Sequence, residues 1–303
     1  MIVINGLTKT FDDVTALDDF HMTVKKGSIY GLVGTNGAGK TTVLKLLSGI
    51  IKADAGILLI DDEIVYENPG IKERLSFIPD DLQFFGGYTL KELSIYFSDV
   101  YAGWNSALFH EIVSAFGLDP RRKLSRFSKG MQKQAVFAVS LATMPDFLIL
   151  DEPIDGLDPL VRKIVWKYIV DASKSRQMTT LVSSHNLREM EGICDSVGII
   201  DGGKMILEKD LDELRSDIHK VQISFGSGED AVRPADIYDS LHIMHRENRG
   251  AIEILIVRNN RETLDRWRDR YRPLLFDPIP LSLEEVFIYE LRGEDHAINS
   301  IIS

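Results

Sequence analysis

The sequence predicts an α/β fold built around a mainly parallel, doubly wound β-sheet. Residues 147–150 form a fully apolar run, which is typical of a strand that is covered on both faces. Patterns for strands and helices alternate along residues 147–207, and parallel strands need such crossover connections. A glycine-rich run at residues 34–39 stands between a predicted strand and a predicted helix, as at the first strand-to-helix turn of many α/β folds.

The first 67 residues predict a β-rich segment that also contains this turn. Strands are expected at residues 2–7 and 21–24, and a hairpin at 56–66 turns at Asp61 and Asp62. Residues 28–33 are typical of a buried strand, and residues 42–48 of the first turns of a helix.

Helical patterns dominate the next stretch. Residues 89–92 have capping-box spacing ahead of an apolar helix at 93–100, and residues 106–116 carry apolar side chains at helical intervals. Asp158 and Pro159 provide an N-cap and a first-turn proline for a helix to about residue 177. Further strands are expected at residues 179–182, 196–200 and 204–207.

The last part of the chain predicts a second, small α+β domain at residues 216–303, which leaves residues 1–215 as the larger domain. Strands are expected here at 221–225 and 252–257, and helices at 262–271 and 283–291. Residues 293–303 are expected to form a loose tail.

Composition narrows the possible functions. The formal net charge of −11 argues against broad attraction to nucleic acid or to anionic lipid. No apolar run approaches the roughly 20 residues that a membrane-spanning helix needs, and no secretory signal is visible. The single cysteine, Cys194, excludes an internal disulfide framework and suits a reducing, cytoplasmic location.

The glycine-rich run fits the phosphate-binding pattern G-x-x-x-x-G-K-[ST]. Glycines let the backbone N–H groups approach phosphate oxygens, and the helix N-terminus adds partial positive charge. Lys40 is expected to reach the β- and γ-phosphates, and the Thr41 hydroxyl is expected to bind Mg²⁺. The residues predicted to bind the nucleotide here are Gly34, Thr35, Asn36, Gly37, Ala38, Gly39, Lys40, Thr41 and Thr42.

Two acids follow the apolar strand at residues 147–150. Their position places both carboxylates at the C-terminal edge of the sheet, where ligands of α/β proteins bind. Asp151 is expected to hold Mg²⁺, directly or through water, and Glu152 to polarise an attacking water. An acid pair alone also fits a solvated loop, but together with the glycine-rich loop it predicts a triphosphate site.

Residues 124–132 resemble the signature sequence of the ATP-binding cassette (ABC) ATPases, L-S-G-G-Q, in the variant S-K-G-M-Q. Ser128 is an N-cap candidate for a helix over residues 130–143, so Ser128 and the Gly130 N–H form a second anion-binding end. The resemblance implies that this end contacts the γ-phosphate bound by a second subunit, either an identical copy or a paralogue. ATP would then close a head-to-tail dimer.

Other residues extend the resemblance. Residues 154–159 resemble the D-loop, His185 resembles the switch histidine that contacts the γ-phosphate, and Phe11 resembles the aromatic that stacks on adenine. Each of the last two residues has a purely structural alternative. His185 could be a polar residue with its hydrogen bonds satisfied within the fold, and Phe11 could be an aromatic residue of the core. Asp80 stands where the family normally has the Q-loop glutamine. Its carboxylate could reach Mg²⁺ or its water, but it would repel the γ-phosphate.

The resemblance covers about residues 1–215 and implies an ABC cassette. Its parts would be a β-rich subdomain, a mainly parallel RecA-like core sheet and a helical subdomain at about residues 82–145, with residues 216–303 as an accessory domain. Residues 282–287 also resemble a segment that closes many bacterial export-type ABC subunits. The implied function is ATP hydrolysis that powers export of antibiotics, peptides or lipid-linked cargo.

Export requires a separate transmembrane permease, which would hold the chain at the inner face of the membrane. We expect it to dock near residues 80–105, whose aromatic residues are Phe84, Phe85, Tyr88, Tyr96 and Tyr101. Two other functions stay open, namely remodelling of nucleic acid or ribosomes and nucleotide-dependent regulation. The acidic charge, the single glycine-rich loop and the short spacing of Lys40 and Ser128 disfavour the first of them.

Overall fold

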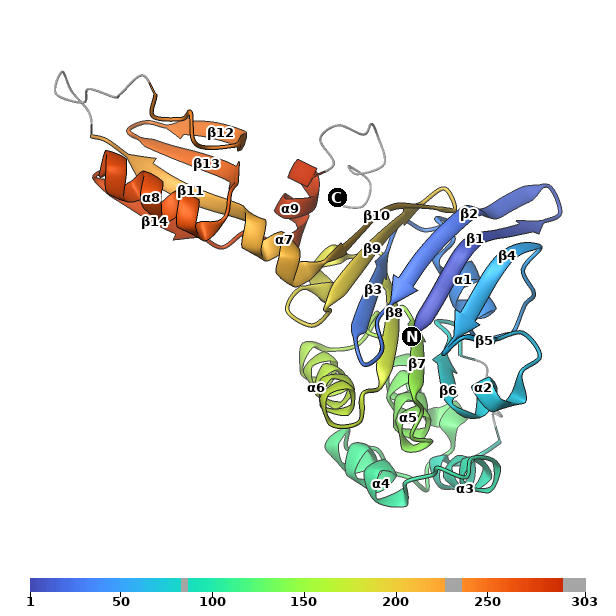
Figure 1. Cartoon of the computed structure of the whole chain (residues 1–303). Helices are drawn as coiled ribbons and strands as arrows, with labels where there is room; N and C mark the ends of the chain where they lie inside the picture. Colours follow the sequence, from blue (N-terminus) through green and yellow to red (C-terminus); the bar gives the residue numbers. More distant parts are fainter. Residues whose placement is uncertain (83–86, 227–235, 291–303) are drawn as a thin grey trace. The chain divides into compact units, whose positions relative to one another are not determined.

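The computed structural model describes residues 1–82, 87–226 and 236–290. Two compact units are present (Figure 1): one contains Met1–Asn186 with Gly192–Glu208, and the other contains Leu187–Glu191 with the described residues from Lys209 onward. Phe84, Phe85 and the tail at 293–303, for which the sequence made predictions, lie outside the described residues.

A four-stranded antiparallel sheet confirms the predicted β-rich segment. Its strand order is β2-β1-β4-β5, with β1 at Ile2–Phe11, β2 at Val14–Val24, β4 at Ala55–Ile60 and β5 at Glu63–Ile64. Asp61 and Asp62 form the predicted turn, and both have left-handed φ angles, 48° and 66°. Two successive residues with positive φ define the turn that matches the twist of a tight hairpin.

The second sheet of this unit confirms the predicted parallel core. Its strand order is β10-β9-β3-β8-β7-β6, and β3 pairs in parallel with both β8 and β9. Every residue of β3 and of β7 is buried, as expected for strands covered on both faces. The strands are β3 at Ile29–Val33, β6 at Leu75–Ile78, β7 at Phe147–Asp151, β8 at Thr179–Ser184, β9 at Ser196–Asp201 and β10 at Lys204–Asp210.

Helices fill the segments between these strands. The helices are α1 at Lys40–Leu47, α2 at Pro69–Glu73, α3 at Leu90–Val100, α4 at Ser106–Ala115, α5 at Lys129–Ala142 and α6 at Pro159–Arg176. Helices α3, α4 and α5 pack together on the side of the core sheet away from the antiparallel sheet (Figure 1). The predicted capping box is present, because Thr89 accepts a hydrogen bond from the Glu92 N–H while the Glu92 carboxylate accepts one from the Thr89 N–H.

The second unit contains an antiparallel sheet of order β12-β13-β11-β14. The sequence predicted only the two central strands, β11 at Ile218–Ser224 and β13 at Ile252–Arg258. The edge strands are β12 at Ile243–Arg249, which is largely polar, and β14 at Leu275–Ile279, which contains a proline. The helices are α7 at Leu211–Asp217, α8 at Arg261–Tyr271 and α9 at Leu283–Glu290.

Candidate nucleotide-binding site

The glycine-rich loop joins β3 to α1 in a shape that only glycine allows at two positions. A Cβ atom on Gly34 would lie 2.4 Å from the Ile200 carbonyl oxygen, and one on Gly39 would lie 2.8 Å from that of Ala16. Gly39 also has a left-handed φ of 110°. Since α1 begins at Lys40, its first N–H groups are directed into the loop, and this arrangement suits a bound phosphate.

Lys40 is buried beneath this loop, with 5% of its surface exposed. Its ammonium donates hydrogen bonds to the carbonyl oxygens of Gly34, at 2.7 Å, and Thr35, at 3.1 Å. Glu152 Oε1 lies 3.5 Å from the same nitrogen. The positive charge therefore stands inside the loop, where the phosphates of a nucleotide would bind.

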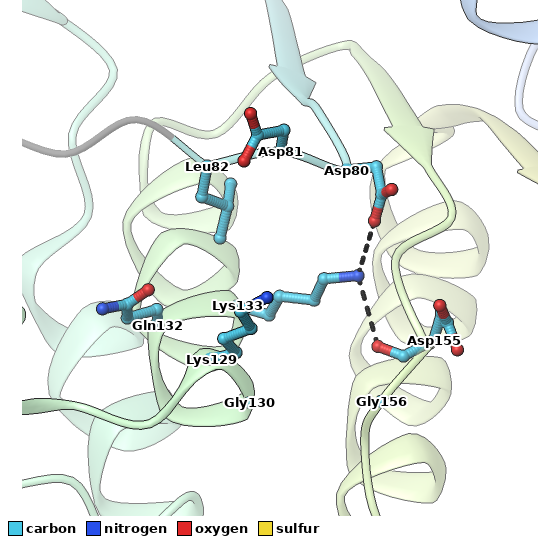
Figure 2. A pocket seen from close by; sticks show the side chains of 9 residues that line it. All are labelled: Asp80, Asp81, Leu82, Lys129, Gly130, Gln132, Lys133, Asp155 and Gly156. Atoms are coloured by element: carbon cyan, nitrogen blue, oxygen red, sulfur yellow. Dashed lines mark hydrogen bonds and ion pairs between the residues drawn. The ribbon is translucent and has the colours of Figure 1, made fainter.

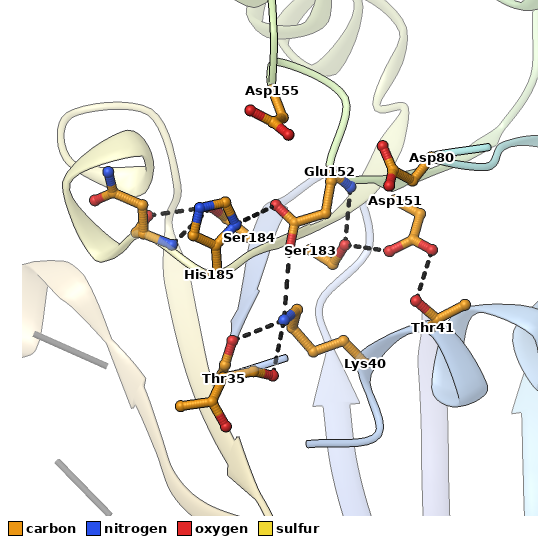
Figure 3. A network of polar contacts seen from close by, with 12 residues as sticks. Thr35, Lys40, Thr41, Asp80, Asp151, Glu152, Asp155, Ser183, Ser184 and His185 are labelled. Atoms are coloured by element: carbon orange, nitrogen blue, oxygen red, sulfur yellow. Dashed lines mark hydrogen bonds and ion pairs between the residues drawn. The ribbon is translucent and has the colours of Figure 1, made fainter. Parts of the chain in front are cut away.

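Asp151 ends β7 and is 3% exposed. Its Oδ2 accepts a 2.8 Å hydrogen bond from the Thr41 hydroxyl, and its Oδ1 accepts a 2.6 Å one from the Ser183 hydroxyl (Figure 3). Ser183 reaches Asp151 because β7 and β8 are parallel neighbours that place the two residues opposite each other. Ser183 was not predicted as a site residue, since β8 also contains Thr179, Thr180 and Ser184 and nothing local distinguishes one hydroxyl from another.

Glu152 follows in a left-handed conformation, with a φ of 45°. Its N–H donates to the Ser183 hydroxyl oxygen at 3.0 Å, and its Oε2 lies 3.0 Å from His185 Nδ1 (Figure 3). An ionised carboxylate only accepts hydrogen bonds, so Nδ1 of His185 is the donor. The structure thus brings together Lys40, Thr41, Asp151, Glu152 and His185, all predicted from separate parts of the sequence.

A cavity of about 350 Å³ is lined by Lys40, Thr41, Asp151 and Glu152. This volume lies within the usual range for small-molecule sites. The sequence did not identify two parts of its wall, residues 14–16 of β2 and the Gly202-Gly203 turn before β10. The Gly203 N–H donates to the Ala38 carbonyl oxygen at 3.0 Å, so this turn is attached to the phosphate loop.

Asp80 also lines this cavity, and its Oδ1 accepts a 3.0 Å ion-paired hydrogen bond from Lys133 of α5. Phe11 is 44% exposed at the end of β1 and is not among the residues that line the cavity. The Lys9 ammonium lies 5.2 Å from its ring centroid. The expected contact of Phe11 with adenine therefore stays a prediction.

The signature segment begins a helix with the predicted N-cap, and its binding of an anion stays a prediction. Ser128 is the N-cap of α5, and its hydroxyl accepts a 3.3 Å hydrogen bond from the Met131 N–H. Gly130, in the first turn of α5, lines a different cavity from Lys40. The structure does not bring Ser128 and Gly130 to the phosphate loop of their own chain.

A lysine inside a glycine-rich loop, a hydroxyl paired with a buried aspartate, and a glutamate beside a histidine define a P-loop ATPase. Comparison with known proteins agrees with this class, since the ABC transporter family model matches residues 17–155. The ABC transporter ATP-binding protein YtrB of Bacillus subtilis (strain 168) is 31% identical over 297 residues, which are 97% of this chain and 99% of that protein. The chain belongs to the ABC transporter ATP-binding proteins.

Two further comparisons cover the larger unit. The bacitracin transport ATP-binding protein BcrA of Bacillus licheniformis is 34% identical over 218 residues, 71% of each protein. A solved ATP-binding subunit of an ABC transporter superposes with a TM-score of 0.65 at 25% identity, covering 71% of this chain and 92% of that one. The chain is accordingly an ATPase subunit of an ABC transporter, with the predicted cassette fold. No helix among the described residues is long and apolar enough to cross a bilayer.

Proposed function

We propose that this chain hydrolyses MgATP at a site shared between two subunits and that hydrolysis drives export through a separate membrane permease. The cassette at residues 1–215 would carry this chemistry, with residues 216–303 as an accessory domain. The observation that carries the proposal is the continuous polar network that joins Thr41 to Asp151, Ser183, Glu152 and His185. The test is the rate of ATP turnover after replacement of Glu152 by glutamine.

Each group in this network has a part in phosphoryl transfer. Lys40 and the loop N–H groups offset the charge that develops on the transferred phosphoryl group, which is the dominant requirement of the reaction. Glu152 accepts the proton of the attacking water, and its contact with His185 fixes the orientation of its carboxylate. His185 is half exposed beside Glu152, in a position to hold the γ-phosphate end.

Mg²⁺ fits the pair formed by Thr41 and Asp151. The ion prefers oxygen ligands and keeps several waters. The protein therefore needs to supply only one hydroxyl and one carboxylate, and the nucleotide supplies phosphate oxygens. The buried Asp151 carboxylate already faces the Thr41 hydroxyl, and Asp80 lines the same cavity as a third candidate ligand. When bound, the ion would neutralise charge on the phosphate oxygens.

Asp80 is expected to contribute little to the rate of hydrolysis. Replacement of Asp80 by glutamine should leave ATPase turnover within about tenfold of the wild type, an effect below about 1.4 kcal/mol. The reason is that the Asp80 carboxylate is half exposed and paired with Lys133, whereas Asp151 and Glu152 hold the buried positions. Steady-state ATPase rates measure the effect, and a loss of several hundredfold would make Asp80 part of the reaction.

A second subunit completes the proposed site. Ser128 and Gly130 form a helix end suited to an anion, yet they lie outside the cavity that holds Lys40. A head-to-tail pair of chains would bring this end of one subunit to the γ-phosphate held by the other. The binding energy of ATP then closes the dimer, and hydrolysis releases it.

The permease is proposed to dock on the α3 surface, which we define as Tyr88, Ile95, Tyr96 and Val100. These side chains are 40–55% exposed, although they are apolar or aromatic. Such exposed groups mark protein or membrane contacts. Export is the proposed direction because BcrA is a bacitracin transport protein and residues 282–287 resemble export-type subunits.

Negative charge on the α3 surface is expected to release the permease. The double variant Tyr96→Glu/Val100→Glu changes two positions one helical turn apart, so both charges lie on one face. Purification from detergent-solubilised membranes should recover at least about tenfold less polytopic partner, because a buried unpaired charge is costly. The purified subunit should keep its ATPase activity.

The matched control is Ile57→Glu/Ile64→Glu on β4 and β5, where the two side chains are 55% and 67% exposed. This control should still recover the partner. Equal recovery by the wild type and the α3 variant would remove the α3 surface as the docking site, and recovery of ribosomes or nucleic acid instead of a membrane protein would contradict the export proposal.

A further inference from the structure

Lys133 uses its whole hydrogen-bonding capacity on three different segments. Its ammonium donates to Asp80 Oδ1 at 3.0 Å, to the Glu152 carbonyl oxygen at 3.0 Å and to the Asp155 carbonyl oxygen at 3.2 Å. Figure 2 shows the side chain extending from α5 between Asp80 and Asp155. A lysine has three donors and no acceptor, and its side chain here is only 14% exposed. Such complete use is unusual for a residue on a helix surface.

The three acceptors belong to the parts of the chain that surround the proposed reaction. Asp80 follows β6 and Glu152 follows β7, and these two strands are parallel neighbours whose C-terminal ends meet at one edge. Asp155 lies in the loop between β7 and α6. Lys133 therefore connects the helix of the signature segment with the backbone of Glu152, directly after β7.

The charges explain why a cation is needed at this point. Asp80, Asp151 and Glu152 all line the cavity where the triphosphate would bind, and Lys40 is the cation in its wall. Lys133 does not line that cavity, but its ammonium pairs with the Asp80 carboxylate and offsets its charge. The Asp80 side chain is 54% exposed, and ion pairs of this kind contribute little to stability. The pair is thus better explained by its effect on the nucleotide than by folding.

We propose that Lys133 is a positioning residue for ATP hydrolysis with two separable effects. Its charge offsets that of Asp80, so that Asp80 does not repel the triphosphate. Its hydrogen bond to the Glu152 carbonyl oxygen fixes the backbone that carries the base. The second effect rests on the proposed role of Glu152, whereas the first does not.

A cycle of three variants separates the two effects. Lys133→Met should weaken binding of a non-hydrolysable ATP analogue at least about fivefold and lower kcat at least about tenfold. Adding Asp80→Asn should restore the affinity to within about twofold of the wild type, because no uncompensated charge remains. The double variant should keep the low kcat, since the contact with the Glu152 carbonyl is still absent. Asp80→Asn alone is the third variant.

Lys167→Met, an exposed lysine on α6, is the matched control and should leave affinity and kcat unchanged. Thermal unfolding of each variant tests folding, and Lys133→Gln replaces the methionine variant if that protein unfolds. Unchanged affinity in the Lys133 variant, or affinity that Asp80→Asn fails to restore, overturns the charge effect. Unchanged kcat overturns the positioning effect. Analogue binding involves no turnover, so its outcome is independent of whether Glu152 is the base.

Discussion

Replacement of Glu152 by glutamine is expected to slow ATP turnover at least about a hundredfold, while ATP still binds. Glutamine keeps the size of the side chain and can still accept a hydrogen bond from His185 Nδ1, which lies 3.0 Å from Glu152 Oε2. It cannot accept the proton of the attacking water. Lys40 and the phosphate loop are unchanged, so the nucleotide keeps its contacts.

Two measurements check this expectation. Single-turnover hydrolysis gives the rate of the chemical step, and equilibrium binding of ATP gives its affinity. Glu73→Gln, at an exposed position at the end of α2, is the control and should behave as the wild type. Since hydrolysis releases the dimer in the proposed cycle, the Glu152 variant should also accumulate as an ATP-bound dimer in size-exclusion chromatography. Turnover near that of the wild type would remove Glu152 from the mechanism.

Local patterns in the sequence were sufficient to predict most of the catalytic edge. The fully apolar strand before Asp151 and the glycine-rich loop before Lys40 each place their functional residue at a strand or helix end. The ends of parallel strands meet at one edge, so the side chains could be expected to come together. The contacts of Thr41 with Asp151 and of His185 with Glu152 show that they do.

Other site residues could not be predicted, because their roles depend on which distant segment lies beside them. Ser183 is 32 residues from Asp151 and reaches it only through the register of β7 and β8. Lys133 is 53 residues from Asp80, and nothing in the local sequence of α5 distinguishes it from a solvated lysine. The Gly202-Gly203 turn looked like an ordinary hairpin turn, and only the fold attaches it to the phosphate loop.

The missed strands of the second unit have a related explanation. The two central strands carry apolar residues that are buried: β13 shows five consecutive buried residues, and β11 buries Ile218, Val221 and Ile223. An edge strand can instead be identified only from the strand with which it pairs. β12 is mostly exposed beyond its first residues, and β14 contains Pro278, a residue that edge strands tolerate. Neither sequence carries a strand pattern without β13 or β11 beside it.

Bulky residues in place of Ser128 and Gly130 of the signature segment are expected to abolish hydrolysis without unfolding the subunit. In the variant Ser128→Leu/Gly130→Leu, the nearest atom outside α5 to a Cβ atom at position 130 is the Gly156 carbonyl oxygen at 3.6 Å, an ordinary contact distance. Loss of the Ser128 N-cap costs about 1 kcal/mol of stability. The side chains would instead occupy the space of the γ-phosphate held by the second subunit. We expect turnover to fall at least about a hundredfold, with ATP binding to the Lys40 loop retained.

Mixing experiments distinguish a shared site from a site within one chain. The Ser128→Leu/Gly130→Leu variant keeps Lys40, and a Lys40→Ala variant keeps the signature segment, so each should be inactive alone. A head-to-tail dimer of the two has one composite site with both parts intact. An equimolar mixture should therefore regain about a quarter of the wild-type rate, since half of the dimers are mixed and each has one of two sites active. Activity no greater than the sum of the separate variants would show that the two subunits do not share the triphosphate, and substantial activity of the signature variant alone would lead to the same conclusion.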